Sequence, residues 1–325
     1  MTHLLLFSFA PSSLILQIVL IAVSIFVVIK GADALTSGGV SLARRMNIPQ
    51  IVIGLTIVAM GTSMPEFCVS FVSALKGTPD LAVGNIVGSN IFNALFIVGC
   101  AALVAPMTIL HSTVRRDIPF ALVSSVMLLM MCLDSTISRV DAAILFLFFV
   151  VFMVITVRGA RQGGDAEETQ QAEEKPKSPA WAASMIVVGL ALLIGGSNVF
   201  VDNASALASS LGVSDAVIGL TIVACGTSLP ELATSVVSAR RGQSGIAIGN
   251  VLGSNVFNIL MILGITGIIQ PMQISGITSV DLSMLVASMI LLWLFSYTKY
   301  TLSRWEGAVL VVVFLGYISW LVANA

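Results

Sequence analysis

Long continuous runs of apolar residues, separated by short polar segments, make up most of the chain. Within these runs the apolar residues do not alternate with polar ones, as they would in a membrane strand, and most runs approach the roughly 20 residues that a membrane-spanning helix needs. They lie at about 13–45, 49–75, 81–105, 118–133 and 140–157, and again at about 181–211, 217–239, 246–269, 282–296 and 306–322. The pattern predicts an all-α membrane protein with ten transmembrane helices.

The one long polar stretch divides the predicted helices into two sets of five. Residues 158–179 are rich in Glu, Gln, Lys and Pro, a composition that is typical of a flexible linker because it cannot bury a core. We therefore expect a first five-helix repeat over residues 1–157, a cytoplasmic linker over 158–179 and a second five-helix repeat over 180–325.

A duplicated polar stretch relates the two sets of helices. The first copy reads Gly-Thr-Ser-Met-Pro-Glu up to Glu66 and then Gly-Asn-Ile-Val-Gly-Ser-Asn-Ile-Phe-Asn up to Asn93. The second copy reads Gly-Thr-Ser-Leu-Pro-Glu up to Glu231 and then Gly-Asn-Val-Leu-Gly-Ser-Asn-Val-Phe-Asn up to Asn258. The offset is 165 residues for both motifs (231 − 66 and 258 − 93), so this region is a gapless internal duplication.

The basic residues of the loops predict how the two repeats lie in the bilayer. An odd number of spans in each repeat requires the second copy to be inverted relative to the first. If the N-terminus lies outside, the cytoplasmic loops hold most of the Lys and Arg residues, and the opposite side holds only Lys76 and Arg139. The cytoplasmic set is Arg44, Arg45, Arg115, Arg116, Arg158, Arg161, Lys175, Lys177, Arg240, Arg241, Lys299 and Arg304. The positive-inside rule therefore predicts that both termini are extracytoplasmic.

Composition agrees with a membrane protein and excludes other classes. The chain is 57% hydrophobic and 10% charged, whereas charged residues make up about 25% of a soluble domain. A net charge of −1 offers no basic surface to a nucleic acid. The four cysteines lie in apolar segments at unrelated spacings and are expected to pack as small hydrophobic residues. We expect a multi-pass protein of the cell (inner) membrane, surrounded by lipid, with no protein partner implied.

The repeated hexapeptides place proline and glutamate in the middle of two apolar runs. Proline removes a helical hydrogen bond, so we expect the second and seventh helices to be broken there and backbone carbonyls near Ala59 and Thr62 to be released. Unpaired backbone at membrane depth is tolerated where it lines a cavity, and inverted-repeat transporters bind ions at such breaks. Gly and Pro in a membrane helix usually mean only a kink, but a duplicated intramembrane glutamate favours an ion site.

Oxygen atoms dominate the polar groups of both breaks and therefore predict a hard cation. Calcium prefers about six to eight oxygen ligands, carboxylates among them. We expect Glu66 and Glu231, with the carbonyls of Thr62 and Thr227 and with water, to form one site whose two negative charges balance one Ca²⁺. The lack of cysteine and histidine ligands argues against zinc or copper.

The Gly-Asn motifs carry polar side chains every four residues, so that each set shares one helix face. The two sets are Asn85, Ser89 and Asn93, and Asn250, Ser254 and Asn258. Interhelical hydrogen bonding is the usual role of such a stripe, but beside two carboxylates we favour ligation by the Asn93 and Asn258 amide oxygens and the Ser89 and Ser254 hydroxyls. Asn90 and Asn255 lie off this face and are expected to bond the backbone of a neighbouring helix.

Two charged residues lie inside the first apolar run. Lys30 is expected to pair with nearby Asp33, because an ion pair lowers the cost of a charge at membrane depth. The alternative is that the Lys30 side chain snorkels to the membrane surface. Asp33 aligns with Asn198 in the second copy and not with Asp202, so these acids are expected to be pairing or pathway residues rather than a duplicated site.

The duplicated motifs resemble those of the calcium/cation antiporter superfamily, most closely the prokaryotic sodium/calcium exchangers, and the resemblance covers both halves of the chain. It implies a ten-helix inverted-repeat fold that exchanges several Na⁺ for one Ca²⁺ by alternating access. It also implies that Glu66, Glu231, Thr62 and Thr227 bind Ca²⁺. The implied sodium sites include Ala59, Ser63, Ser89, Ala224, Ser228 and Ser254, with Asn93 at a central position. Some relatives carry Asp where this chain has Asn258, and potassium-dependent exchangers use that Asp for K⁺, so Asn258 argues against K⁺ co-transport.

The resulting hypothesis is a secondary antiporter rather than an enzyme, with Na⁺ and Ca²⁺ as its substrates and no cofactor. A proton/calcium antiporter that uses the same glutamates is the nearest alternative. A cation channel lined by these carboxylates is a less favoured one. An intramembrane hydrolase is disfavoured, because no histidine lies at membrane depth and no nucleophile–base pair is evident.

Overall fold

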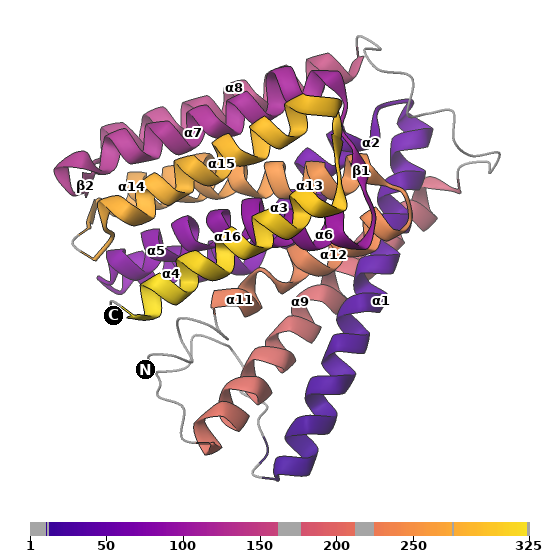
Figure 1. The fold of residues 1–325 in the computed structure, drawn as a ribbon, viewed down its shortest axis with the longest axis horizontal. Helices are drawn as coiled ribbons and strands as arrows, with labels where there is room; N and C mark the ends of the chain where they lie inside the picture. The colour runs from indigo at the N-terminus through magenta and orange to yellow at the C-terminus, as the bar shows by residue number, and fades with distance from the viewer. Residues whose placement is uncertain (1–10, 12, 162–176, 212–223, 275, 324–325) are drawn as a thin grey trace.

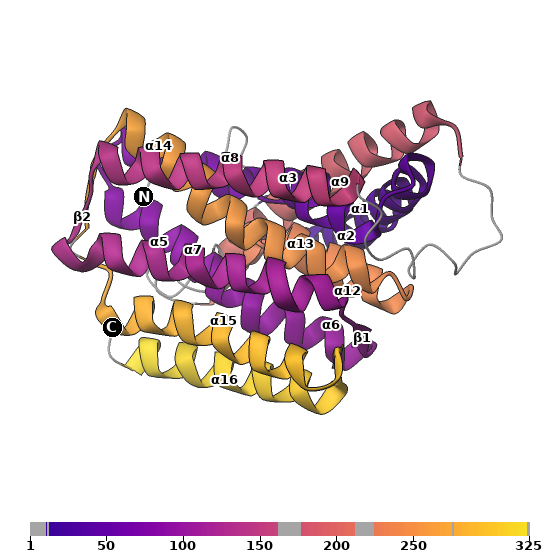
Figure 2. The same ribbon diagram turned by 90° about the horizontal axis from the view of Figure 1, so that it is seen from above.

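The fold is almost entirely helical (Figures 1 and 2). The computed structural model describes residues 11, 13–161, 177–211, 224–274 and 276–323.

The first half of the chain begins with one long helix and continues through several interrupted ones. Its elements are α1 (Leu14–Met46), α2 (Gln50–Ile53), the π-helical segment η1 (Gly54–Val58), α3 (Ala59–Thr62), α4 (Met64–Leu75), α5 (Pro79–Ile91), η2 (Phe92–Ile97), α6 (Val98–Val104), β1 (Met107–Thr108), η3 (Thr113–Asp117), α7 (Ile118–Met131), η4 (Cys132–Asp134), β2 (Thr136–Ile137) and α8 (Arg139–Arg161). The predicted continuation of the first helix as far as Arg45 is confirmed by α1.

The second half repeats this order. Its described elements are α9 (Pro179–Ser210), α11 (Ala224–Thr227), α12 (Leu229–Arg240), α13 (Ser244–Val256), η7 (Phe257–Ile262), α14 (Leu263–Ile269), β3 (Met272–Gln273), α15 (Ser279–Lys299), β4 (Thr301–Leu302) and α16 (Arg304–Ala323).

The apolar helices are long enough to make this a multi-pass membrane protein. Within the described residues, eight helices can cross a membrane by length and composition, and the bent pair Gln50–Thr62 and Met64–Leu75, with an angle of 48° between its parts, makes a ninth. The predicted seventh helix begins near residue 217, which lies outside the described residues; its described part is α11 and α12.

Side-chain caps mark where several of these helices begin. At the start of α15, Thr278 Oγ1 accepts from the Asp281 N–H, and Asp281 Oδ2 accepts from the Thr278 N–H at 2.9 Å. At the start of α16, Glu306 Oε2 accepts from the Ser303 N–H at 2.7 Å. Such caps satisfy N–H groups that have no partner inside the helix.

Two spans form the centre of the protein. In the most apolar window of residues 79–104, and in that of residues 244–269, 78% of the residues are buried, against 22–39% in the other spans. The helices α7, α8, α15 and α16 pack around this centre (Figure 2). Their outer faces carry large exposed apolar side chains such as Leu147 and Val312, as expected of a surface that faces lipid.

The long helices α1 and α9 form a separate pair that extends away from the other helices (Figure 1). Glycines let their backbones approach closely, because a methyl group at Gly189 would lie 2.6 Å from the Leu35 nitrogen and one at Gly38 would lie 2.8 Å from the Ala182 oxygen. Close contact through small residues is typical of helix pairs in membranes, where packing rather than the hydrophobic effect holds helices together.

Two short antiparallel ladders connect the halves of the chain. β1 pairs with β4, with Met107 opposite Leu302, and β2 pairs with β3, with Ile137 opposite Met272. The 165-residue offset relates the two ladders (272 − 107 and 302 − 137). Each half therefore contributes one strand to each ladder, and neither half completes a ladder alone.

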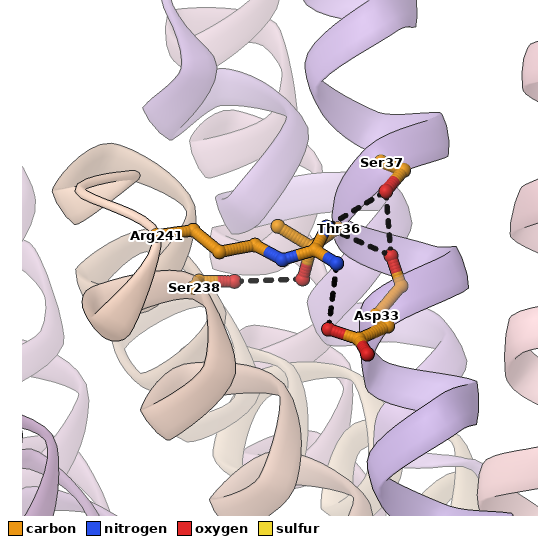
Figure 3. A network of polar contacts seen from close by, with 5 residues as sticks. All are labelled: Asp33, Thr36, Ser37, Ser238 and Arg241. Carbon is orange, nitrogen blue, oxygen red and sulfur yellow. Dashed lines mark hydrogen bonds and ion pairs between the residues drawn. The ribbon is translucent and has the colours of Figure 1, made fainter.

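The predicted pairing of Lys30 with Asp33 is wrong. Asp33 forms an ion pair with Arg241, with 2.7 Å between Oδ1 and Nη2 (Figure 3), and Lys30 Nζ lies 5.4 Å from the centre of the Phe26 ring. Lys30 and Asp33 are close in sequence, but Arg241 approaches the side of α1 that carries Asp33.

We expect Gly189→Ala to destabilise the protein, because the added methyl group would collide with the α1 backbone. Overpacking of this kind costs about 1–3 kcal/mol, so the unfolding temperature in detergent should fall. The matched control is Gly195→Ala on the same helix, where a Cβ meets no atom within 4 Å and alanine is the better helix former by about 1 kcal/mol. Equal stability of the two variants would contradict the tight α1–α9 contact.

Candidate ion-binding site

The first break in the helical backbone lies at Ser63. This residue separates α3 from α4 with φ −81° and ψ 7°, and Pro65 follows in the first turn of α4. Proline has no N–H to continue the helical hydrogen bonds. Glu66, also in that first turn, is 1% exposed. The break therefore presents a buried carboxylate at the start of a new helix.

The second break has the same local structure. Ser228 separates α11 from α12 with φ −89° and ψ 11°, Pro230 follows in the first turn, and Glu231 is fully buried. The predicted interruptions near Gly61–Pro65 and Gly226–Pro230 are thus both present in the structure. Both have the same cause, a proline at the second residue of the second part of the helix.

Each glutamate is held by the serine of the other break. Ser228 Oγ donates to Glu66 Oε1 at 2.8 Å, and Ser63 Oγ donates to Glu231 Oε1 at 3.0 Å. Ser63 lies three residues before Glu66, and Ser228 lies three residues before Glu231, so these two bonds hold the two breaks against each other. The structure therefore brings together two acids that are 165 residues apart in sequence (231 − 66).

The polar stripes of the Gly-Asn motifs meet the broken helices, as predicted. Asn85 Nδ2 donates to the Glu66 carbonyl at 3.3 Å, and Asn250 Nδ2 donates to the Glu231 carbonyl at 3.2 Å. Ser254 Oγ donates to Glu231 Oε1 at 3.4 Å. These bonds fix each stripe against the first turn that carries its glutamate.

Two further serines support this arrangement, and the sequence interpretation missed them. Asn85 Nδ2 also donates to Ser70 Oγ, and Asn250 Nδ2 to Ser235 Oγ, each at 2.9 Å. Both serines occupy equivalent positions (235 − 70 is again 165), which is the signal that would have identified them.

The remaining predicted site residues lie on the same elements. Thr62 ends α3 and donates from Oγ1 to Asn250 Oδ1 at 3.0 Å, and Thr227 ends α11. Ser89 is buried on α5, and Ala224 is the first residue of α11.

The prediction that the break releases the Ala59 carbonyl is wrong. This oxygen accepts from the Ser63 N–H at 3.0 Å and from Thr62 Oγ1 at 3.3 Å. The break at Ser63 lies within the predicted range, but Ser63 keeps its own N–H and bonds Ala59 with it. The N–H that Pro65 lacks would have bonded the carbonyl four residues back, that of Gly61.

Among the buried oxygen atoms of the described residues that have no hydrogen-bond partner in the protein, four belong to the duplicated motifs. They are Oε2 of Glu66, Oε2 of Glu231, Oδ1 of Asn93 and Oδ1 of Asn258. A buried acceptor without a partner costs about 1–3 kcal/mol, and more when it is charged. All four atoms are acceptors, and the elements that carry them are in contact, α4 with η7 and α12 with η2. A hard cation suits such atoms, whereas an anion or a hydrogen-bond acceptor does not.

No basic side chain neutralises the two glutamates within the part of the chain that the structure describes. The ion pairs there are Arg116 with Asp117 and Arg241 with Asp33. The serines orient the two carboxylates but leave their negative charge uncompensated, which is the electrostatic condition for binding a cation at membrane depth.

Comparison with known proteins identifies the family. The model of the sodium/calcium exchanger protein family matches residues 16–158 and 181–323. The putative antiporter CaxA of Alkalimonas amylolytica is 39% identical over 307 residues, covering 92% of this chain and 96% of the relative. The inner membrane protein YrbG of Escherichia coli is 37% identical over 319 residues, covering 95% and 98%.

Exchangers with more specific names are also similar. The sodium/calcium exchanger MaX1 of Methanosarcina acetivorans is 29% identical over 328 residues, covering 89% of this chain and 94% of that protein. A solved structure of the sodium-calcium exchanger NCX_Mj, soaked with zero Na⁺ and Ca²⁺, superposes with a TM-score of 0.83 at 28% identity and covers 95% of this chain and all of the other. The chain therefore belongs to the sodium/calcium exchanger protein family, and it is an antiporter of the exchanger type.

Proposed function

We propose that this antiporter exchanges Na⁺ for Ca²⁺ at a single site formed by the two helix breaks. The observation that carries the proposal is that four acceptor oxygens of the duplicated motifs, those of Glu66, Glu231, Asn93 and Asn258, are buried without a protein partner. The ion pairs of the described residues involve neither glutamate. One Ca²⁺ balances the two carboxylates, and its preference for oxygen ligands matches the set. Na⁺ is also a hard cation and competes for the same oxygens.

The remaining ligands of the proposed site come from both motifs. Ca²⁺ binds the two glutamates and the carbonyls of Thr62 and Thr227, and the Asn93 and Asn258 amide oxygens complete the central set. The proposed sodium positions use the helix breaks and the serines of the stripes. These residues are Ala59, Ser63, Ser89, Ala224, Ser228 and Ser254.

We also propose that the fold consists of two inverted five-helix repeats, residues 1–157 and 180–325, with both termini extracytoplasmic. The recurrence of the serine–glutamate bonds and of the strand pairing at one offset supports the duplication. The basic residues of the loops support the orientation. The proposed cytoplasmic linker, 158–179, falls mainly on residues 162–176, which lie outside the described residues.

Alternating access is supported by an asymmetry around the site. α1 packs along α12, whereas the equivalent helices α9 and α4 make almost no contact. Figure 3 shows Arg241 reaching from the end of α12 to Asp33 and Ser37 on α1, with 2.7 Å from Nη1 to the Ser37 hydroxyl. Beside this ion pair, Thr36 and Ser238 share a buried hydroxyl–hydroxyl hydrogen bond of 2.9 Å (Figure 3).

The equivalent contacts do not form between α9 and α4, the helices that correspond to α1 and α12 in the other repeat. At the 165-residue offset, Ser73 corresponds to Ser238, and its buried hydroxyl has no partner within the described residues. Val201 replaces Thr36 and Asn198 replaces Asp33. Arg241 belongs to the basic, cytoplasmic set of loops, so we propose that α1 closes the cytoplasmic side here and separates from α12 when the site opens inward. Ion binding drives this change only because the ions bind the two states with different affinity.

We expect Glu66→Gln and Glu231→Gln each to abolish sodium-driven calcium flux in proteoliposomes, because each removes half of the charge that faces Ca²⁺. A loss of roughly 100-fold or more is expected, equivalent to about 2.7 kcal/mol. Glu306→Gln is the matched control, since Glu306 is a buried glutamate that caps α16 away from the site. Full exchange in either site variant would defeat the site assignment.

An outward Na⁺ gradient is expected to drive calcium uptake into proteoliposomes, and K⁺ and Li⁺ gradients of equal size are not. The measurement is ⁴⁵Ca²⁺ uptake under separate Na⁺, K⁺, Li⁺ and H⁺ gradients. Uptake that follows the pH gradient and ignores Na⁺ would identify a proton/calcium antiporter. Flux that needs no counter-ion would identify a channel.

Asp33→Asn is expected to favour the inward-open state, because it removes an ion pair that holds α1 on α12. The two side chains are 31% and 39% exposed, so the pair contributes about 0.2–1 kcal/mol, and the populations should shift by up to roughly fivefold. Hydrogen exchange of residues 229–241 in nanodiscs should rise accordingly. Lys76→Gln, at the position equivalent to Arg241, is the control. Identical hydrogen exchange in the two variants would contradict the proposal that the Asp33–Arg241 ion pair holds α1 on α12.

A further inference from the structure

Asn90 and Asn255 cross between the two central helices and bond each other's backbone. Asn90 Nδ2 donates to the Asn255 carbonyl at 3.0 Å, and Asn255 Nδ2 donates to the Asn90 carbonyl at 3.2 Å. Both side chains are buried, and Asn255 Nδ2 also lies 3.5 Å from Met289 Sδ. A backbone carbonyl only accepts hydrogen bonds, so each of these amides must direct its NH₂ group toward it.

The remaining oxygen of each amide then determines the orientation of a second one. Asn255 Oδ1 accepts from Asn93 Nδ2 at 3.0 Å, and Asn90 Oδ1 accepts from Asn258 Nδ2 at 2.9 Å. Asn93 and Asn258 therefore donate hydrogen bonds from their NH₂ groups to the opposite central helix. Their own side-chain oxygens are buried and have no partner in the protein.

The oxygen and NH₂ ends of an asparagine amide have nearly the same shape, so packing alone does not decide which end a cation meets. A flipped Asn93 would present N–H dipoles to a positive ion and would repel it. We infer that Asn90 and Asn255 are positioning residues that fix the polarity of the ion site: through these hydrogen bonds they make Asn93 and Asn258 present oxygen to the transported cation.

This inference rests on the proposed function and assigns a role that simple helix–helix adhesion does not predict. Adhesion alone requires only that the central helices stay together, so its loss lowers stability without a specific effect on ion affinity. If Asn255 and Asn90 orient the two amides, a substitution of Asn255 changes the ion affinity through Asn93. A substitution of Asn90 changes it through Asn258.

The test uses Asn255→Leu, Asn93→Asp and the double variant of the full chain in detergent, with Ca²⁺ binding measured by isothermal titration calorimetry. Asn255→Leu frees the Asn93 amide to rotate, so affinity should fall about tenfold, the value of one hydrogen bond of about 1.4 kcal/mol. A carboxylate at position 93 presents oxygen to the ion in either orientation. In the single variant, however, it has no N–H to donate to Asn255 Oδ1, so two acceptor oxygens face and repel each other. The added charge by itself raises the affinity for Ca²⁺ in both backgrounds. The gain in affinity from Asn93→Asp should therefore be larger in the Asn255→Leu background than in the wild type.

Unchanged affinity in Asn255→Leu, or an equal gain from Asn93→Asp in both backgrounds, would overturn the inference. The unfolding temperature without ions, measured in parallel, identifies a merely structural effect, because a destabilised core is not repaired by an added charge. If Asn255→Leu does not fold, Asn90→Leu with Asn258→Asp provides the equivalent test. Wild-type protein that does not bind Ca²⁺, or binding that survives Glu66→Gln, would instead refute the proposed function itself.

Discussion

The constraint on which the structure depends is a pair of carboxylates buried in the hydrocarbon layer. Surroundings of low polarity do not replace the water that an ionised carboxylate loses, so such a group needs both hydrogen bonds and a compensating charge. Glu66 and Glu231 each receive a serine hydrogen bond from the opposite break and retain one oxygen without a partner. The protein orients the two carboxylates, and in the proposed function their neutralisation falls to a bound ion that can leave again.

The contacts at the centre of the protein follow the internal duplication, whereas those of the α1–α9 pair do not. Serine–glutamate bonds, asparagine bonds and strand ladders all recur at one offset and all join the two halves, so neither half forms the site alone. The α1–α9 pair breaks this pattern, because α1 contacts α12 while α9 does not contact α4 in the same way. A nearly symmetric site beside an asymmetric pair of helices is suited to opening on one side at a time.

Much of the fold and of the candidate site follows from patterns that are local in the sequence. The apolar runs predict the spans because burial in lipid requires them, and proline at 65 and 230 predicts the breaks because it lacks an N–H. The spacing of four residues places Asn85 and Asn250 on the faces that meet the broken helices. Asn90 and Asn255 lie off those faces, and their bonds to a neighbouring backbone are confirmed as predicted.

The tertiary structure alone decided which distant groups become partners. The local prediction for Asp33 was Lys30, three residues away, yet its partner is Arg241, 208 residues away. Sequence patterns specify which groups need a partner. The choice of partner depends on how helices from opposite halves pack, and that packing is set by many contacts that no single stretch of sequence contains.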